Sequence, residues 1–180
     1  MNPIDTISRR QFIQAGAVTA ATITAPSILR GAEPTSEPVR VAQIGLGTRG
    51  NDLIRVVGSN KACKVVAVCD VYQPHLRRGV DLSNNPDVKT YVDYKELLND
   101  PQVEAVIIAT PDHWHERIVL DALSAGKHVY IEKPMTWRLD EGPRIIAAQK
   151  RAGKLLQVGS QPKTSALTAK AREIVRSEEH

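Results

Sequence analysis

Five short runs of apolar, mostly β-branched residues recur along the chain from residue 39 onward. Because the apolar positions in each run are consecutive rather than alternating, they predict strands that are buried on both faces. Such strands belong to parallel sheets that are covered by helices on both sides. The predicted strands are Val39–Ile44, Lys64–Val68, Ala105–Ala109, Val129–Ile131 and Leu155–Val158.

Segments with helical spacing of apolar positions separate these strands. Gly126 and Gly153 follow two of the segments as helix stops, and Asp93 with Glu96 forms a capping box at the start of another. Alternating strands and helices predict an α/β fold built on a doubly wound parallel sheet. The predicted helices are Thr48–Val57, Gln73–Leu82, Tyr94–Leu98, His113–Ala125, Leu139–Arg151 and Ala166–Arg176.

A glycine-rich turn follows the first predicted strand. Its sequence, Gly45-Leu46-Gly47-Thr48-Arg49-Gly50, has the spacing of a dinucleotide-binding fingerprint, and Asp70 stands 20 residues after it at the end of the second strand. The turn would hold a pyrophosphate at a helix N-terminus. Asp70 would accept hydrogen bonds from the ribose 2′-hydroxyl and repel a 2′-phosphate, which favours NAD over NADP.

The first 32 residues predict an export signal. Arg9 and Arg10 precede an uncharged run rich in alanine and threonine, the pattern of a twin-arginine signal. The alternative is an amphipathic N-terminal helix. We therefore expect a periplasmic protein, anchored in the membrane if the signal is not cleaved, with residues 33–38 as a linker.

Composition excludes other classes of protein. Hydrophobic residues make up 42% and charged residues 24% of the 180 positions, which is unlike a collagen, a coiled coil or a disulfide-stapled domain. The net charge is +4, of which +2 lies in residues 1–32, and the 21 basic and 19 acidic residues of the remainder are interspersed. We therefore predict no nucleic-acid partner.

The two cysteines carry no predicted redox function. Cys63 and Cys69 flank an extended strand, which places their Cα atoms about 20 Å apart, far beyond the ~7 Å limit for a disulfide. We expect both to be small buried residues.

Two further segments follow predicted strands and carry chemistry. They are Ala109-Thr110-Pro111-Asp112-His113-Trp114-His115 and Glu132-Lys133-Pro134. Asp112, His113 and His115 are potential metal ligands, but no cysteine or second carboxylate cluster accompanies them, so we predict no metal. Trp137 either packs in the core, the role that we favour, or lines the same cleft, and Trp114 either packs or recognises substrate.

With these motifs the chain resembles the N-terminal half of the glucose–fructose oxidoreductase, inositol dehydrogenase and rhizopine-catabolism family (Gfo/Idh/MocA). The resemblance covers residues 39–161, which we take as the Rossmann domain, and leaves 162–180 as a helix that leads toward a C-terminal domain absent from this chain. Family members are about twice this long, which implies a fragment. The present sequence departs from the family pattern at Pro162-Lys163, where an arginine is usual.

The resemblance implies roles for individual residues. Lys133 corresponds to the lysine beside the nicotinamide and the substrate hydroxyl, and His115 is its expected catalytic companion. A cis bond is expected before Pro134. His113 and Trp114 are weaker candidates for substrate contact. The expected cofactor-binding residues are Gly45, Leu46, Gly47, Thr48, Arg49, Gly50, Asp70, Thr110, Pro111, His115, Glu132, Lys133 and Pro134.

Three functions are compatible with these residues. The first is an exported NAD-dependent oxidoreductase that acts on a sugar, polyol or related carbohydrate and forms a homo-oligomer when full length. The second is an NAD-dependent glycosidase of the same superfamily, with no net redox change. The third is a non-catalytic dinucleotide-binding module.

Overall fold

The computed structural model describes residues 37–160 and 165–177. The predicted export signal, residues 33–36 of the predicted linker and Gln161 lie outside the described residues. Helix α7 (Ala166–Arg176) has the predicted bounds and begins at Ser165, whose side chain accepts a hydrogen bond from the Thr168 N–H at 3.1 Å. No helix in the described part of the chain has the length and apolar character needed to cross a bilayer.

Six parallel strands form a single sheet in the order β3-β2-β1-β4-β5-β6. The chain enters in the middle at β1, moves to one edge through β2 and β3, returns beside β1 as β4, and then continues to the other edge. The predicted doubly wound parallel sheet is confirmed. The strands are β1 (Val39–Ile44), β2 (Cys63–Cys69), β3 (Lys89–Tyr91), β4 (Ala105–Ile108), β5 (His128–Glu132) and β6 (Leu156–Gly159).

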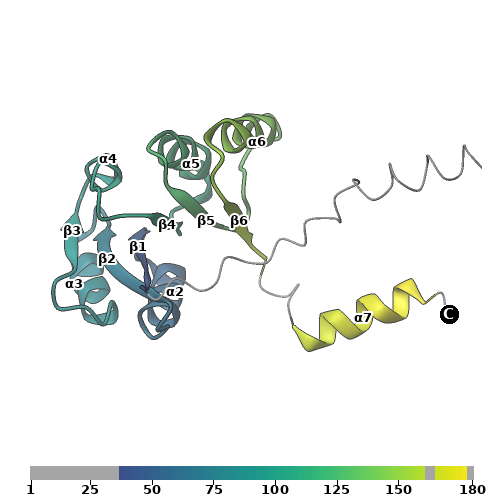
Figure 1. Cartoon of the computed structure of the whole chain (residues 1–180), viewed down its shortest axis with the longest axis horizontal. Helices are drawn as coiled ribbons and strands as arrows, with labels where there is room; N and C mark the ends of the chain where they lie inside the picture. Colours follow the sequence, from purple (N-terminus) through teal and green to yellow (C-terminus); the bar gives the residue numbers. More distant parts are fainter. Residues whose placement is uncertain (1–36, 161–164, 178–180) are drawn as a thin grey trace, which may run out of the picture. The chain divides into compact units, whose positions relative to one another are not determined.

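Helices cover the sheet from both sides (Figure 1). Helices α2 and α3 pack together on one side, and α4, α5 and α6 form the layer on the other. The strand order reverses between β1 and β4, and ligands of open α/β sheets bind at the carboxyl ends of the strands beside such a point. The helices are α2 (Thr48–Gly58), α3 (Gln73–Leu82), α4 (Tyr94–Leu98), α5 (His115–Ser124) and α6 (Glu141–Ala152), with a 3₁₀ turn at Asp112–Trp114.

The apolar core lies between the sheet and these helix layers. One cluster gathers around β4, β5 and α5, with Val106, Ile108 and Ile131 among its members. A smaller cluster, which includes Leu46 and Ile54, fills the space under α2 and α3. Leu46 is fully buried, so the residue between the first two glycines of the turn fastens that turn to the core.

Three details differ from the sequence predictions. Strand β3 was not predicted, because Lys89–Tyr91 is a short polar edge strand without an apolar run. Helix α5 begins at His115 rather than His113, since Pro111 first directs the chain into the 3₁₀ turn. The side chain of Asp93 caps the Lys95 N–H, one position earlier than a capping box requires.

The cysteines both lie in β2, and both thiols are free. Only Cys69 is buried; Cys63 is half-buried, so the prediction of two buried cysteines was wrong for one of them. Burial raises the pKa of the Cys69 thiol to about 12, and the neighbouring Asp70 carboxylate acts in the same direction. Cys69 is therefore protonated and inert at neutral pH.

Candidate functional site

The glycine turn between β1 and α2 has a backbone that only glycine fits. Gly45 has a φ of +89°, and a Cβ added there would lie 2.6 Å from the carbonyl oxygen of Ala109. A Cβ at Gly50 would clash with the carbonyl of Gly45. The turn therefore packs directly against the end of β4, and the sequence prediction of a tight turn with close packing agrees with this geometry.

The N-terminus of α2 is open to a ligand. Its N-cap is Gly47, which has no side chain to cap the first N–H groups, and a Cβ added there would meet no atom within 4 Å. Unpaired N–H groups and the helix dipole favour an anion. The residues present therefore fit the pyrophosphate of a dinucleotide.

Asp70 extends from the end of β2 into the same region. Its carboxylate accepts hydrogen bonds from the Leu46 N–H at 2.7 Å and the Tyr72 N–H at 2.9 Å, and the His75 ring nitrogen lies 3.2 Å away. Asp70 thus ties the glycine turn to the start of α3. A cleft of about 420 Å³ opens beside it, a volume typical of small-molecule sites. Its lining includes Gly45, Asp70, Val71, Val92, Thr110, Pro111 and Trp114.

Thr110 follows β4 and lines this cleft. Its hydroxyl oxygen is buried and has no hydrogen-bond partner among the described residues. Buried polar atoms are nearly always paired, so an orphaned hydroxyl on a residue that lines a cleft fits a ligand that supplies the missing hydrogen bond. Thr110 and Pro111 both line this cleft, and their contacts with the cofactor stay a prediction.

His115 joins the two loops that follow β4 and β5. The residue is 1% exposed, with Nδ1 2.7 Å from the carbonyl oxygen of Pro134 and Nε2 3.0 Å from that of Thr110. Both partners are backbone carbonyl oxygens, which only accept hydrogen bonds, so the ring is held between the two loops. This geometry makes His115 a positioning residue; the direct catalytic role predicted for it would require the ring to leave both carbonyls.

Glu132 and Lys133 lie at the end of β5, and their side chains have opposite surroundings. The Glu132 carboxylate is buried and pairs with the Arg49 guanidinium at 2.8 Å and 2.9 Å. This pair links the glycine turn to the second motif and raises the pKa of Arg49. Lys133, by contrast, is exposed, and its ammonium group contacts no side chain among the described residues. The Lys133–Pro134 bond is cis, as predicted.

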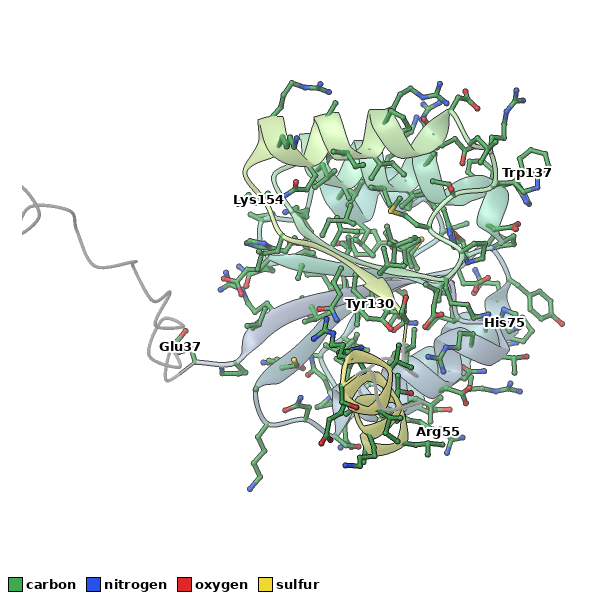
Figure 2. All side chains as sticks on the ribbon, turned by 90° about the vertical axis from the view of Figure 1, so that its right-hand side faces the viewer. Glu37, Arg55, His75, Tyr130, Trp137 and Lys154 are labelled. Atoms are coloured by element: carbon green, nitrogen blue, oxygen red, sulfur yellow. The ribbon has the colours of Figure 1, made fainter. Side chains whose placement is uncertain are left out.

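Three aromatic rings form an exposed group in the loops that follow β4 and β5. The ring centroids of His113 and Trp137 are 6.3 Å apart, and those of His113 and Trp114 are 6.2 Å apart. Trp137 is 62% exposed, so the prediction that it packs in the core was wrong. In Figure 2, Trp137 and His75 lie at one end of the strands, while Glu37 and Lys154 lie toward the other.

The predicted site residues thus gather at the carboxyl ends of the strands. They come from the loops that follow β1, β2, β4 and β5, and those loops are tied together by Asp70, His115 and the Arg49–Glu132 pair. Among the residues that the structure describes, no three histidine, cysteine, aspartate or glutamate side chains are arranged to hold a metal ion.

Comparison with known proteins assigns the family. The family model described as an oxidoreductase family with an NAD-binding Rossmann fold, named GFO_IDH_MocA, matches residues 39–160. The chain belongs to the Gfo/Idh/MocA family. The described domain is its NAD-binding Rossmann domain, and the resemblance drawn from the sequence motifs is confirmed.

Individual relatives differ in what their names say. An α-N-acetylgalactosaminidase from Shewanella oneidensis is 31% identical over 82% of this chain and 38% of its own length. A probable dehydrogenase from Thermotoga maritima is 30% identical, with a TM-score of 0.67 over 77% of this chain and 41% of that one. The chain therefore spans about two fifths of the length of these relatives.

A third relative shows likeness of fold alone. It is a scyllo-inositol dehydrogenase from Lactobacillus casei with bound NAD(H) and scyllo-inositol, 21% identical, with a TM-score of 0.71 over 78% of this chain and 41% of that one.

Sequence reasoning missed three features of this Gfo/Idh/MocA site. His75 contacts Asp70, Arg49 pairs with Glu132 across 83 positions, and Trp137 stands in solvent beside His113. The first has a local signal, because a histidine one turn into a helix can reach the acid that ends the preceding strand. The other two join loops that are distant in sequence, so no spacing rule could have found them.

Proposed function

We propose that the protein is an NAD-dependent oxidoreductase that transfers a hydride between nicotinamide and a sugar, polyol or related carbohydrate. The observation that carries this proposal is Lys133: it is exposed, its ammonium has no partner among the described residues, and it stands at the end of the strand that the Glu132–Arg49 pair ties to the glycine turn. A lysine that has no ion-pair partner and lies at the end of the sheet where we expect the cofactor is suited to exchange a proton with a ligand.

The chemistry assigns separate tasks to the residues of this edge. Bound nicotinamide supplies a hydride acceptor. As the substrate C–H bond gives up its hydride, the hydroxyl on that carbon would pass its proton to the side-chain nitrogen of Lys133, and a carbonyl group would form. Glu132 fixes the backbone of Lys133 by accepting its N–H at 3.1 Å, and His115 holds the neighbouring loop in place. Substrate alignment by such rigid loops lowers the entropic part of the barrier.

We propose NAD rather than NADP as the cofactor. Asp70 is an anion at the end of β2, beside a cleft of suitable volume, and a 2′-phosphate on the adenosine ribose would be repelled by it. His75, 3.2 Å from the same carboxylate, is the group that could moderate this repulsion when protonated.

A glycosidase that uses NAD without net redox is the second candidate. The names of the curated relatives favour it, since they include an α-N-acetylgalactosaminidase and several glycosyl hydrolase family 109 proteins. Such an enzyme oxidises the sugar transiently, eliminates the leaving group and returns the hydride. Lys133 would have the same task, because the first step is again loss of a hydride and a hydroxyl proton.

Absorbance at 340 nm distinguishes the candidates in the full-length protein. Net NADH formed with a free sugar or polyol identifies the oxidoreductase, whereas aglycone released from a glycoside without net NADH identifies the glycosidase. In a third outcome, the protein binds NAD but forms neither product, and Lys133→Ala binds NAD as tightly as the parent protein. That outcome would replace both candidates with a non-catalytic binding module. The same variant should retain NAD binding in the two catalytic cases.

We also propose export by the twin-arginine route, supported by Arg9 and Arg10 in the sequence. Replacement of both arginines by lysine should leave the protein in the cytoplasm, as cell fractionation would show. Equal periplasmic recovery of the variant and the parent protein would contradict this proposal. Homo-oligomerisation of the full-length protein stays a prediction.

A further inference from the structure

We propose that Trp137, His113 and Trp114, in the loops that follow β4 and β5, form an aromatic ledge that binds the apolar face of a pyranose ring. This inference rests on the proposed function, and it narrows the substrate from carbohydrates in general to those with a six-membered ring. It also assigns a role to Trp137, for which the sequence had favoured core packing over a place in the cleft.

The rings of the ledge are more exposed than is usual for large aromatic side chains. Trp137 is 62% exposed and Trp114 47% exposed, although large aromatic rings usually bury most of their area. Exposed apolar groups that cluster, rather than occur singly, mark binding sites. The rings come from two loops that are separated by helix α5 and strand β5, so their proximity is a product of the fold.

The ledge is also held rigidly. The backbone N–H groups of Trp137 and Arg138 both donate to Oε2 of Glu141, at 2.8 Å and 3.1 Å, and Glu141 is itself buried at the start of α6. Below the rings, His115 connects the same two loops through the carbonyl groups of Thr110 and Pro134. The two loops are therefore connected by the hydrogen bonds of His115 and by the ring contacts of His113.

Ring orientation leaves the aromatic faces available. The planes of His113 and Trp137 are inclined by 70°, and those of His113 and Trp114 by 44°, so none of these pairs is stacked face to face. A pyranose gathers several C–H bonds on one face of its ring, and these carry the partial positive charge that the negative face of an indole attracts. An acyclic polyol distributes its hydroxyl groups on both sides and offers no such face.

The position of the ledge connects it to the reaction. Trp137 is four residues after Lys133, and His113 is two residues before His115. A ring bound on the ledge would thus lie at the same sheet edge as the exposed lysine and the glycine turn. The imidazole of His113 adds a polar group at the rim that can exchange hydrogen bonds with ring hydroxyls.

The test compares Trp137→Ala, Trp137→Phe and Leu139→Ala in the full-length, NAD-loaded protein. Leu139 is fully exposed in the same loop and carries no ring, so it is the matched control. We expect Trp137→Ala to raise KM for a pyranoside about tenfold with kcat within about threefold, Trp137→Phe to restore most of the loss, and Leu139→Ala to change neither constant. The melting temperature of all three should match that of the parent protein.

Saturation-transfer NMR supplies an independent readout. The probes are methyl α-D-galactopyranoside, methyl N-acetyl-α-D-galactosaminide and sorbitol. On saturation of the aromatic resonances, the C–H protons of one pyranoside face should receive the largest transfer, sorbitol should receive little, and the pyranoside signal should fall in Trp137→Ala.

Each of the following results would refute the proposed ledge. A KM for Trp137→Ala within twofold of the parent value, with Lys133→Ala inactive, refutes the ledge and leaves the proposed function standing. An altered oligomeric mass of Trp137→Ala with an unchanged KM identifies the rings as a protein contact. Parent protein that binds NAD but neither pyranoside, even at high millimolar concentration, refutes the ledge and the proposed carbohydrate function together.

Discussion

Charged residues at the amino ends of the strands differ in their partners from those at the carboxyl ends. Near the amino ends of β4 and β5, Asp100 accepts hydrogen bonds from Lys89 at 2.7 Å, Tyr91 at 2.9 Å and the Gln102 N–H at 2.9 Å. Lys127 donates to the carbonyl oxygens of Asp100 and Val103. Every one of these polar groups is satisfied by the chain itself, as buried charges require.

At the carboxyl edge, by contrast, several polar groups are left to a ligand. Lys133 has no side-chain partner and the Thr110 hydroxyl has no partner at all within the described residues, while the N-terminus of α2 begins at an uncapped glycine. The comparison teaches that a charge with all its partners stabilises the fold, whereas a charge without them marks where chemistry can occur.

Removal of the unpaired lysine should give the largest effect. Lys133→Met is expected to lower kcat by about 10²- to 10⁴-fold, the usual contribution of a proton-transfer group. Stability should change little, because the side chain is exposed and makes no hydrogen bond or ion pair among the described residues. Turnover and thermal melting of the full-length protein measure the two quantities. Lys150→Met, on the exposed side of α6, is the control and should alter neither. Equal kcat for the parent and Lys133→Met would remove this residue from the mechanism.

The opposite variant, Asp100→Asn, should reduce stability and leave activity intact. The hydrogen bond from Lys89 lowers the pKa of the Asp100 carboxyl below its unfolded value. This pair therefore stabilises the fold above the unfolded pKa, and its contribution is lost as pH falls through the folded pKa. We expect the variant to lose about 1–3 kcal/mol of unfolding free energy at pH 7 and less near pH 3.

Urea denaturation at both pH values checks this expectation. Asp81→Asn, an exposed position in α3, is the matched control and should be neutral at both. A loss of the same size at pH 7 and pH 3 would show that the carboxylate charge has no part in it.

Cofactor preference should respond more modestly. Asp70→Asn keeps the acceptor for the Leu46 N–H but removes the negative charge. We expect the Kd for NAD to rise about tenfold and the preference for NAD over NADP to fall, since a charged hydrogen bond becomes a neutral one and the repulsion of a 2′-phosphate is lost. Isothermal titration with both cofactors measures this. An unchanged Kd ratio would place selectivity elsewhere.

The smallest effect is expected at Cys69, which stands at the carboxyl edge but is buried. Because burial raises its thiol pKa to about 12, iodoacetamide at pH 8 should modify Cys63 first and leave Cys69 unreacted. Mass spectrometry counts the adducts, and denatured protein, in which both cysteines react, is the control. Labelling of Cys69 in the folded protein at the rate of Cys63 would show that this edge opens.

How much could be predicted is seen best in particular elements. The strand at residues 39–44 and the helix at 166–176 have the predicted bounds, because an apolar run and an amphipathic period are local properties. Strand β3 escaped prediction because hydrogen bonds to β2, rather than its own polar sequence, make it a strand. The 3₁₀ turn at Asp112–Trp114 was likewise hidden within an apparently helical segment.

The same distinction between local and tertiary features applies to the residues of the candidate site. Spacing and motif found the glycine turn, Asp70, Thr110 and the Glu132-Lys133-Pro134 segment, since each is a short element with a recognisable order of residues. They did not show that the His115 ring lies between two backbone carbonyl groups, or that Trp137 stands in solvent. Burial and partners depend on what the rest of the chain brings to a residue.

The sequence by itself determined the family and the alternating α/β order, and it predicted which residues meet at the carboxyl ends of the strands. These are encoded in periodicity and short motifs, which need no knowledge of distant segments. Only the tertiary structure decided which polar groups are satisfied and which are free: Arg49 with Glu132, Asp100 with Lys89, and Lys133 with neither. The physical reason is that hydrogen bonding and burial are set by neighbours in space, and parallel strands bring together residues that lie tens of positions apart in the chain.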